Sequence, residues 1–134
     1  KAKRAYTIVN TPVLVEDVSL SFSALHGLPG PLIKWFYETL GNEGLAKILN
    51  PYPDRTATAE VCFALCDENG VHTFCSSKEG PISKEPRGEA GFGWDPIFTP
   101  NGYTKTWAEM VDDEKHETSM RKLALEKLKY FLSS

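Results

Sequence analysis

Residues 56–76 read TATAEVCFALCDENGVHTFCS and decide the fold. Residues 56–66 are rich in β-branched and aromatic side chains, and similar residues return in 71–76, which is typical of strands. Between them, 67–70 reads Asp-Glu-Asn-Gly, and Asn-Gly tolerates the positive φ angles that tight hairpin turns require. The stretch therefore predicts a β-hairpin.

The chain before the hairpin begins with residues 1–9, a charged and then apolar segment that predicts the tail of a helix. Residues 12–15, Pro-Val-Leu-Val, form a short apolar run typical of a buried strand. This run leads directly into Glu16 and Asp17. We therefore expect two carboxylates at the end of a strand, on a rigid support.

Helices are expected on both sides of the hairpin. A dense turn at 27–31 precedes a predicted helix at 32–40, which Gly41 ends, and a second short helix is expected at 43–49. Near the carboxyl terminus, apolar residues recur at helical spacing and predict an amphipathic helix docked on the sheet: Met120, Leu123, Ala124, Leu128 and Phe131. The alternation of elements indicates a mixed α/β domain with helices packed on a long sheet.

Composition indicates one globular domain over residues 1–134. The chain is 41% hydrophobic, has a formal net charge of −3, and lacks any apolar run near the ~20 residues that span a bilayer. Its longest basic cluster is the short Lys-Ala-Lys-Arg at 1–4, which is too small for the charge footprint of a protein that binds duplex nucleic acid. We therefore expect neither nucleic acid nor a membrane as a partner.

Three cysteines, Cys62, Cys66 and Cys75, lie in the hairpin. A zinc site would need a fourth ligand, and a secreted disulfide framework would have an even count. We therefore expect free, half-buried thiols and a cytoplasmic location. The three histidines are far apart and form no metal-binding pair.

Residues 91–98, GFGWDPIF, are the strongest candidate for a binding segment. Phe92 and Trp94 supply flat apolar faces, and the glycines on either side of Phe92 allow close backbone approaches, which suits a planar ligand. The alternative is a strand edge with a bulge around a hydrogen-bonded Asp95. In both cases we expect a strand or strand end here.

Acidic and basic side chains near these segments could act on phosphates. Three acidic positions, Glu16-Asp17, Asp95 and Glu109, carry carboxylates that could hold magnesium or orient a water. The cations that could meet phosphates or a base edge are Lys1, Lys34, Lys115 and Arg121. Each of these charges, taken alone, also fits a solvated surface position.

Four ordered segments carry a family resemblance. They are PVLVED at 12–17, LHGLPGPLIKWF at 25–36, FGWDP at 92–96 and KTWAEM at 105–110. Together they resemble the inosine triphosphate pyrophosphatase family over almost the whole chain. The resemblance implies a mixed α+β fold with a long mixed central β-sheet flanked by helices.

The resemblance also implies an activity. Members of this family use magnesium to hydrolyse ITP, dITP and XTP to the monophosphate and pyrophosphate, which removes deaminated purines from the nucleotide pool, and they are commonly homodimers. By this resemblance Asp17 is the catalytic carboxylate that binds magnesium or polarises the attacking water. Lys1 matches a lysine that reaches the triphosphate, and Lys34 matches another lysine that contacts the ligand.

Further residues match the part of the family site that holds the base. Phe92, Gly93, Trp94 and Asp95 match the segment that flanks the nucleotide, with the aromatic rings around the purine and Asp95 bonded to nearby polar groups. Lys115 and Arg121 match residues that meet the base through its 6-keto oxygen. A keto oxygen accepts hydrogen bonds where the amino group of adenine donates them, so such donors would favour hypoxanthine and xanthine.

Two departures from the family pattern leave alternatives open. No TGNxxK loop, metal-binding glutamate or amino-terminal strand and helix precedes Lys1, so we expect a truncated domain whose open sheet edge favours self-association. Met120 stands where the family has histidine between serine and arginine, and methionine cannot donate a hydrogen bond, which bears on turnover and base selectivity. One alternative is an incomplete member that binds purine nucleotide without turnover. Another is a structural role for Asp17 and Asp95.

Overall fold

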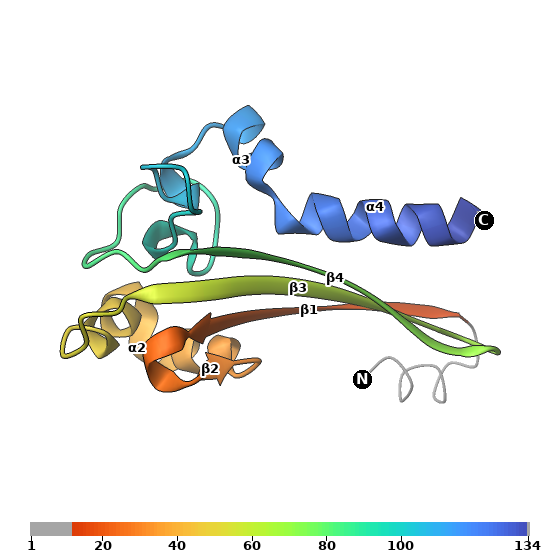
Figure 1. Cartoon of the computed structure of the whole chain (residues 1–134), viewed down its shortest axis with the longest axis horizontal. Helices are drawn as coiled ribbons and strands as arrows, with labels where there is room; N and C mark the ends of the chain where they lie inside the picture. Colours follow the sequence, from red (N-terminus) through yellow and green to blue (C-terminus); the bar gives the residue numbers. More distant parts are fainter. Residues whose placement is uncertain (1–11, 134) are drawn as a thin grey trace.

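The computed structural model describes residues 12–133, in which a four-stranded sheet carries helices on its faces (Figure 1). Its elements are β1 (Val13–Phe22), the 3-10 turn η1 (Ser23–Leu25), β2 (Pro29–Gly30), α2 (Ile33–Ile48), β3 (Thr56–Asp67), β4 (Gly70–Pro81), the 3-10 turns η2 (Asp95–Ile97) and η3 (Trp107–Glu109), α3 (Asp112–Thr118) and α4 (Met120–Ser133). The helix expected at 1–9, including Lys1, lies outside the described residues. No helix within 12–133 is both long and apolar enough to cross a membrane.

The strands run in the order β2-β1-β3-β4, and each described pair of neighbours is antiparallel. The predicted hairpin is confirmed, because β3 and β4 pair along their full length across the turn at Glu68-Asn69. Alternate side chains of β3 enter the core: Ala57, Ala59, Val61 and Phe63. The mixed α/β class is therefore confirmed, with no parallel pair among the described strands.

The carboxyl-terminal helix α4 lies along one face of the hairpin (Figure 1). Met120, Ala124 and Leu128 are buried at helical spacing, which confirms the predicted amphipathic helix, whereas Leu123 and Phe131 of the predicted apolar face are exposed. Near its end, the ring centroids of Phe131 and Phe74 lie 5.2 Å apart. This packing fixes the start of α4, and with it Arg121, relative to the sheet.

Helix α2 is interrupted where the sequence predicts a break. Gly41 has φ 68° and ψ 178°, which lie outside the helical region and inside the range that favours glycine. The two helical pieces bury Ile33 on one side of the break, and Leu45 and Ala46 on the other. The predicted pair of short helices is therefore confirmed as one kinked element.

The expectation for the first strand is wrong in its length and in the position of its acids. Strand β1 continues through Glu16 and Asp17 as far as Phe22, so both carboxylates lie within the strand and not after it. Nor is its first part fully buried, since Leu14 is 49% exposed. The reason is tertiary: β3 offers ten consecutive partners, from Cys66 opposite Val13 to Ala57 opposite Phe22.

The cysteine expectation is also wrong for two of the three residues. Cys62 and Cys75 form a disulfide, while Cys66 is a buried free thiol. The two bonded cysteines are direct cross-strand partners on β3 and β4, with Cα atoms 4.1 Å apart. Asp17 of β1 lies opposite Cys62, so all three residues belong to one row across the sheet. The expectation of a cytoplasmic location rests on free thiols, so the disulfide removes that argument.

This disulfide predicts a specific thiol count. Protein purified without reductant and denatured in guanidinium should react with one equivalent of a thiol reagent, because only Cys66 is free. After reduction, the same protein should react with three equivalents. Three equivalents before reduction would show that the sheet forms without the Cys62–Cys75 bond.

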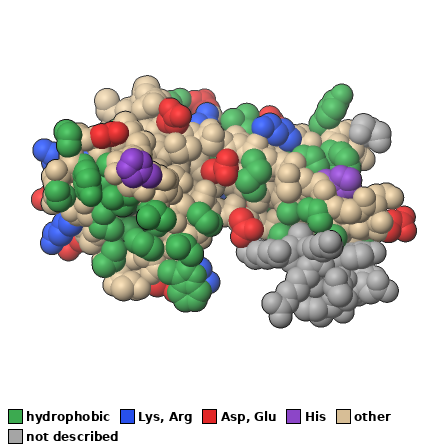
Figure 2. Space-filling view, turned by 60° about the horizontal axis from the view of Figure 1, so that its bottom comes forward, with side chains coloured by type: hydrophobic (Ala, Val, Ile, Leu, Met, Phe, Trp, Pro, Cys, Tyr) green, Lys and Arg blue, Asp and Glu red, His purple; other side chains and the backbone are tan. Residues whose placement is uncertain are grey.

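Apolar side chains gather on the part of the surface that contains α2 (Figure 2). Four of them form what we call the α2 patch: Leu28 at 55% exposure, Leu32 at 48%, Trp35 at 65% and Leu40 at 43%. A group of large exposed apolar side chains on one part of the surface is a candidate interaction site.

Candidate functional site

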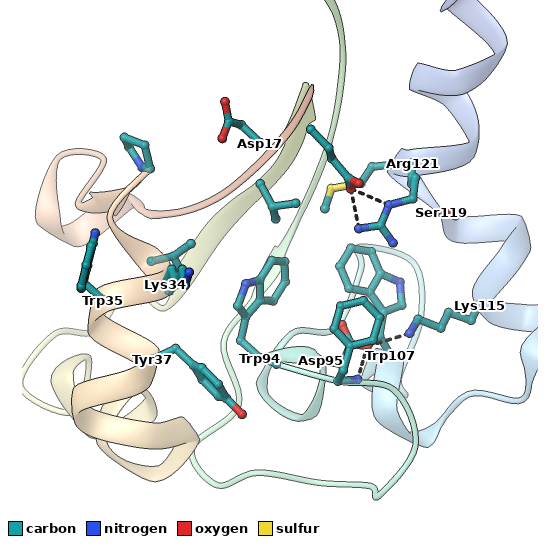
Figure 3. A pocket seen from close by; sticks show the side chains of 17 residues that line it. Asp17, Lys34, Trp35, Tyr37, Trp94, Asp95, Trp107, Lys115, Ser119 and Arg121 are labelled. Carbon is teal, nitrogen blue, oxygen red and sulfur yellow. Dashed lines mark hydrogen bonds and ion pairs between the residues drawn. The ribbon is translucent and has the colours of Figure 1, made fainter. Parts of the chain in front are cut away.

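A cavity of about 460 Å³ opens where β1, the start of α2, segment 92–95 and the start of α4 meet (Figure 3). Its volume lies in the range of small-molecule sites. Eight of the nine residues predicted from the sequence line it: Asp17, Lys34, Phe92, Gly93, Trp94, Asp95, Lys115 and Arg121. The ninth, Lys1, lies outside the described residues. The fold thus brings together side chains from four separate segments of the chain.

The segment 91–98 is not a strand, which corrects the sequence expectation. It is an irregular loop that ends in the 3-10 turn η2, because Gly91 and Gly93 have φ angles of 76° and 60°. A Cβ atom on Gly91 would overlap the Asp95 carboxylate, so glycine is required there for a steric as well as a conformational reason. The loop presents Phe92 at 69% exposure over the cavity.

Asp95 holds this loop and one of the cations. Its Oδ2 accepts a hydrogen bond of 3.1 Å from the Phe92 backbone N–H and another of 2.7 Å from Lys115 Nζ. Asp95 is only 8% exposed, and burial of a carboxylate is tolerated when it is paired and hydrogen-bonded. The predicted bonding of Asp95 to nearby polar groups is confirmed.

Phe92 lies beneath both predicted base-facing cations. Lys115 Nζ is 5.3 Å from the ring centroid and Arg121 Cζ is 6.0 Å from it, within the range of cation–π contacts. Arg121 is bound in turn by Glu16 of β1, with 2.6 Å from both Nε and Nη2 to Glu16 Oε1. This end of the cavity therefore combines a flat apolar face with oriented N–H donors.

An aromatic cluster packs against the end of the cavity where Phe92, Lys115 and Arg121 lie. The Trp107 ring lies 5.8 Å from that of Trp94 and 4.7 Å from that of Phe98. Its Nε1–H donates to Thr118 Oγ1 at 2.8 Å, and the Thr118 hydroxyl donates to the Lys115 carbonyl at 3.0 Å. Trp107 thus fixes α3, and through it Lys115, relative to the loop.

Asp17 and Lys34 lie on the opposite side of the cavity from Lys115 and Arg121 (Figure 3). Both are exposed, Asp17 on β1 and Lys34 in the first turn of α2. A carboxylate and a lysine at this end can orient water and neutralise phosphate charge, respectively.

The donors near Asp17 bear on the expected magnesium. Within residues 12–133, no three His, Cys, Asp or Glu side chains cluster in the manner of a metal site. Magnesium is, however, usually held by one or two carboxylates together with substrate phosphates. Asp17 fits that arrangement as a protein ligand, whereas a cage made only of protein groups does not fit.

Two other residues, the sequence candidate Glu109 and His116 of α3, lie outside the cavity lining. Glu109 closes a capping box in η3, where its Oε1 accepts a hydrogen bond of 2.9 Å from the Thr106 N–H. His116, which is close in sequence to Met120, borders a separate shallow groove with Lys122 and Lys129. Neither residue therefore takes the place of a site residue, and Met120 itself lines the cavity.

Sequence reasoning missed several lining residues. Among them are Tyr37, Trp107 and Ser119. Tyr37 follows Lys34 by three residues on α2, so helical spacing from a predicted ligand could have indicated it. Trp107 begins η3 and Ser119 lies between α3 and α4, and the place of both depends on tertiary packing, which no local pattern reveals.

Comparison with known proteins places the chain in a family. The Ham1 family model matches residues 1–131. The chain is 52% identical to the inosine triphosphate pyrophosphatase of Yarrowia lipolytica, over 99% of this chain and 71% of that protein. It is 48% identical to the enzyme of the same name from Batrachochytrium dendrobatidis, over 100% of this chain and 70% of that protein.

Solved structures agree with this result. A HAM1 protein from Coxiella burnetii matches with a TM-score of 0.88 and 31% identity, over 98% of this chain and 72% of that one. A nucleoside-triphosphatase (dITP/XTP pyrophosphatase) from Mycobacterium abscessus matches with a TM-score of 0.80 and 30% identity, over 95% and 69%. The sequence and the fold thus lead to the same group, and the chain belongs to the Ham1 family.

Proposed function

We propose that this chain hydrolyses the deaminated purine nucleoside triphosphates ITP, dITP and XTP, whose bases carry a 6-keto oxygen, to the monophosphate and pyrophosphate. The observation that carries the proposal is the two-ended cavity, with Phe92 under two donors at one end and Asp17 with Lys34 at the other. Relatives at about half identity are named for this reaction on ITP, which supports it.

The donor end accounts for discrimination against adenine. Ammonium and guanidinium groups donate hydrogen bonds and accept none, so Lys115 and Arg121 pair with a keto oxygen and not with the adenine amino group. A mismatched base would leave polar groups unpaired in a partly buried site. The exposed ring of Phe92 offers the face on which a purine stacks.

The other end accounts for hydrolysis. Asp17 orients and polarises the water that attacks the α-phosphorus, and the bond from that phosphorus to the oxygen bridging to the β-phosphate breaks. Lys34 neutralises charge on the phosphates as the pyrophosphate leaves. Magnesium, held by Asp17 and the substrate phosphates, would supply further charge neutralisation.

We also propose a homodimer in the cytoplasm. The α2 patch supports self-association, because its four large apolar side chains are exposed. The supply of nucleoside triphosphates in the cytoplasm supports the location, whereas the cysteines do not. Sedimentation velocity over a wide concentration range tests the dimer, and a single monomeric species throughout would contradict it.

Pyrophosphate release tests the function. With magnesium present, the chain should release pyrophosphate from ITP and XTP with kcat/KM at least about 100-fold above that for ATP, since the donors match only a 6-keto base. A folding check by circular dichroism accompanies the assay. A folded chain that releases no pyrophosphate from ITP or XTP, or that prefers ATP, would contradict the proposal.

A further inference from the structure

Glu16 binds the guanidinium that faces the base end of the cavity. Arg121 Nε and Nη2 both lie 2.6 Å from Glu16 Oε1, and the two residues are 105 positions apart in the chain. Both side chains are partly exposed, at 43% for Arg121 and 34% for Glu16. The contact therefore joins β1 to the first turn of α4 across the cavity mouth.

The register of the sheet places the Glu16 side chain on the α4 side. Glu16 lies opposite Phe63 of β3, a buried residue of the core. Direct cross-strand partners share a face of the sheet, and neighbours along a strand alternate between faces. Glu16 therefore faces α4, while the side chain of the adjacent Asp17 lies on the other face of the sheet.

The Arg121 side chain lies between two spaces on the surface. It borders both the cavity and the separate groove that Lys122 and Lys129 line on the outside of α4. A long arginine side chain can reach either space, and solvation by itself would favour the open groove. The Glu16 carboxylate holds the guanidinium at the cavity, where it also contacts the Phe92 ring.

The pair leaves enough donors for a ligand while removing net charge. A guanidinium has five N–H donors in a fixed planar fork, and Glu16 takes up two of its nitrogens. The plane of the remaining N–H groups is thereby set. Because the pair is neutral overall, Arg121 acts as an oriented donor, whereas an unpaired cation would attract the phosphates of any nucleotide.

We propose that Glu16 is a positioning residue that determines base specificity by holding Arg121 toward the 6-keto oxygen. This inference rests on the proposed function. It separates the tasks of two adjacent residues of β1: Asp17 acts at the phosphates, and Glu16 acts on the base through Arg121. Its signature is a loss of selectivity, not a general loss of affinity.

The test compares dissociation constants for IMP and AMP, measured by isothermal titration calorimetry. In Glu16→Ala, the ratio of the AMP dissociation constant to the IMP dissociation constant should fall about tenfold, because one charged hydrogen-bond interaction is lost. The dissociation constant for AMP should stay unchanged or decrease. Glu16→Gln keeps one acceptor oxygen and should lie between Glu16→Ala and the wild type. Glu38→Ala, an exposed carboxylate on α2 outside the cavity lining, is the matched control and should retain the wild-type preference.

A double-variant cycle shows whether Glu16 acts through Arg121. Once Arg121→Ala is in place, adding Glu16→Ala should leave the IMP preference unchanged, because the intermediary is already absent. An unchanged preference in Glu16→Ala alone, or equal weakening of both ligands, would overturn the inference. A wild-type chain with no preference for IMP would instead contradict the proposed function, so the two failures are distinguishable.

Discussion

Asp17→Asn is expected to lower kcat for ITP hydrolysis by a factor of about 10²–10⁴ without changing the thermal unfolding midpoint. Asparagine has nearly the same shape but carries no charge, so it can neither take a proton from the attacking water nor bind a hard cation well. Because Asp17 is exposed on β1, the substitution removes no core packing. The KM for ITP should change far less than kcat.

A matched control separates this effect from a general loss of negative charge. Glu68→Gln also neutralises one exposed carboxylate, at the hairpin turn and outside the cavity lining, and should leave kcat unchanged. A wild-type kcat in Asp17→Asn would contradict the catalytic role of this residue and favour a structural one.

The largest expected effect on stability comes from Asp95→Ala, which should lower the free energy of unfolding by about 2–4 kcal/mol. The substitution leaves the Phe92 N–H and Lys115 Nζ without the acceptor they now share. Lys115 is 31% exposed and water partly compensates it, which holds the cost below that of a fully buried pair. Urea denaturation monitored by tryptophan fluorescence measures the change.

The same variant should also weaken nucleotide binding, since the loop that carries Phe92 loses its anchor. Asp95→Asn keeps an acceptor for the backbone N–H and should be intermediate in stability. Glu89→Ala removes an exposed carboxylate from the same loop and should cost little. If Asp95→Ala were as stable as Glu89→Ala, the carboxylate would not be the anchor of the loop.

Local patterns were enough to predict the hairpin, the kinked α2 and the amphipathic α4. Each has a repeat or a turn signal that its own residues carry: Asn69-Gly70 for the hairpin, Gly41 for the kink, and Met120, Ala124 and Leu128 for α4. In these elements the tertiary environment agrees with local preference.

The errors arose where a partner element decides the outcome. Strand β1 passes through Glu16 and Asp17 because β3 continues beside it, and no pattern within β1 reveals that. The disulfide follows from register, since Cys62 and Cys75 lie equally far from the hairpin turn. The sequence contains this symmetry, whereas the number of cysteines alone predicts free thiols.

The site was predicted largely through motifs, and its arrangement came from the fold. Sequence reasoning named Asp95, Lys115 and Arg121 as separate candidates, and the structure shows that Asp95 binds Lys115 while Glu16 binds Arg121. Pairings between residues so far apart depend on how α3 and α4 pack against the loop and the sheet. Sequence spacing therefore could not reveal them.

A crystal structure of Asp17→Asn with ITP would test the central claim most directly, because slow turnover should preserve the bound substrate. Hypoxanthine should stack on Phe92, with its 6-keto oxygen within hydrogen-bond distance of Lys115 or Arg121 and the triphosphate extending toward residue 17 and Lys34. A base bound at the Asp17 end, or a nucleotide bound outside this cavity, would contradict the claim.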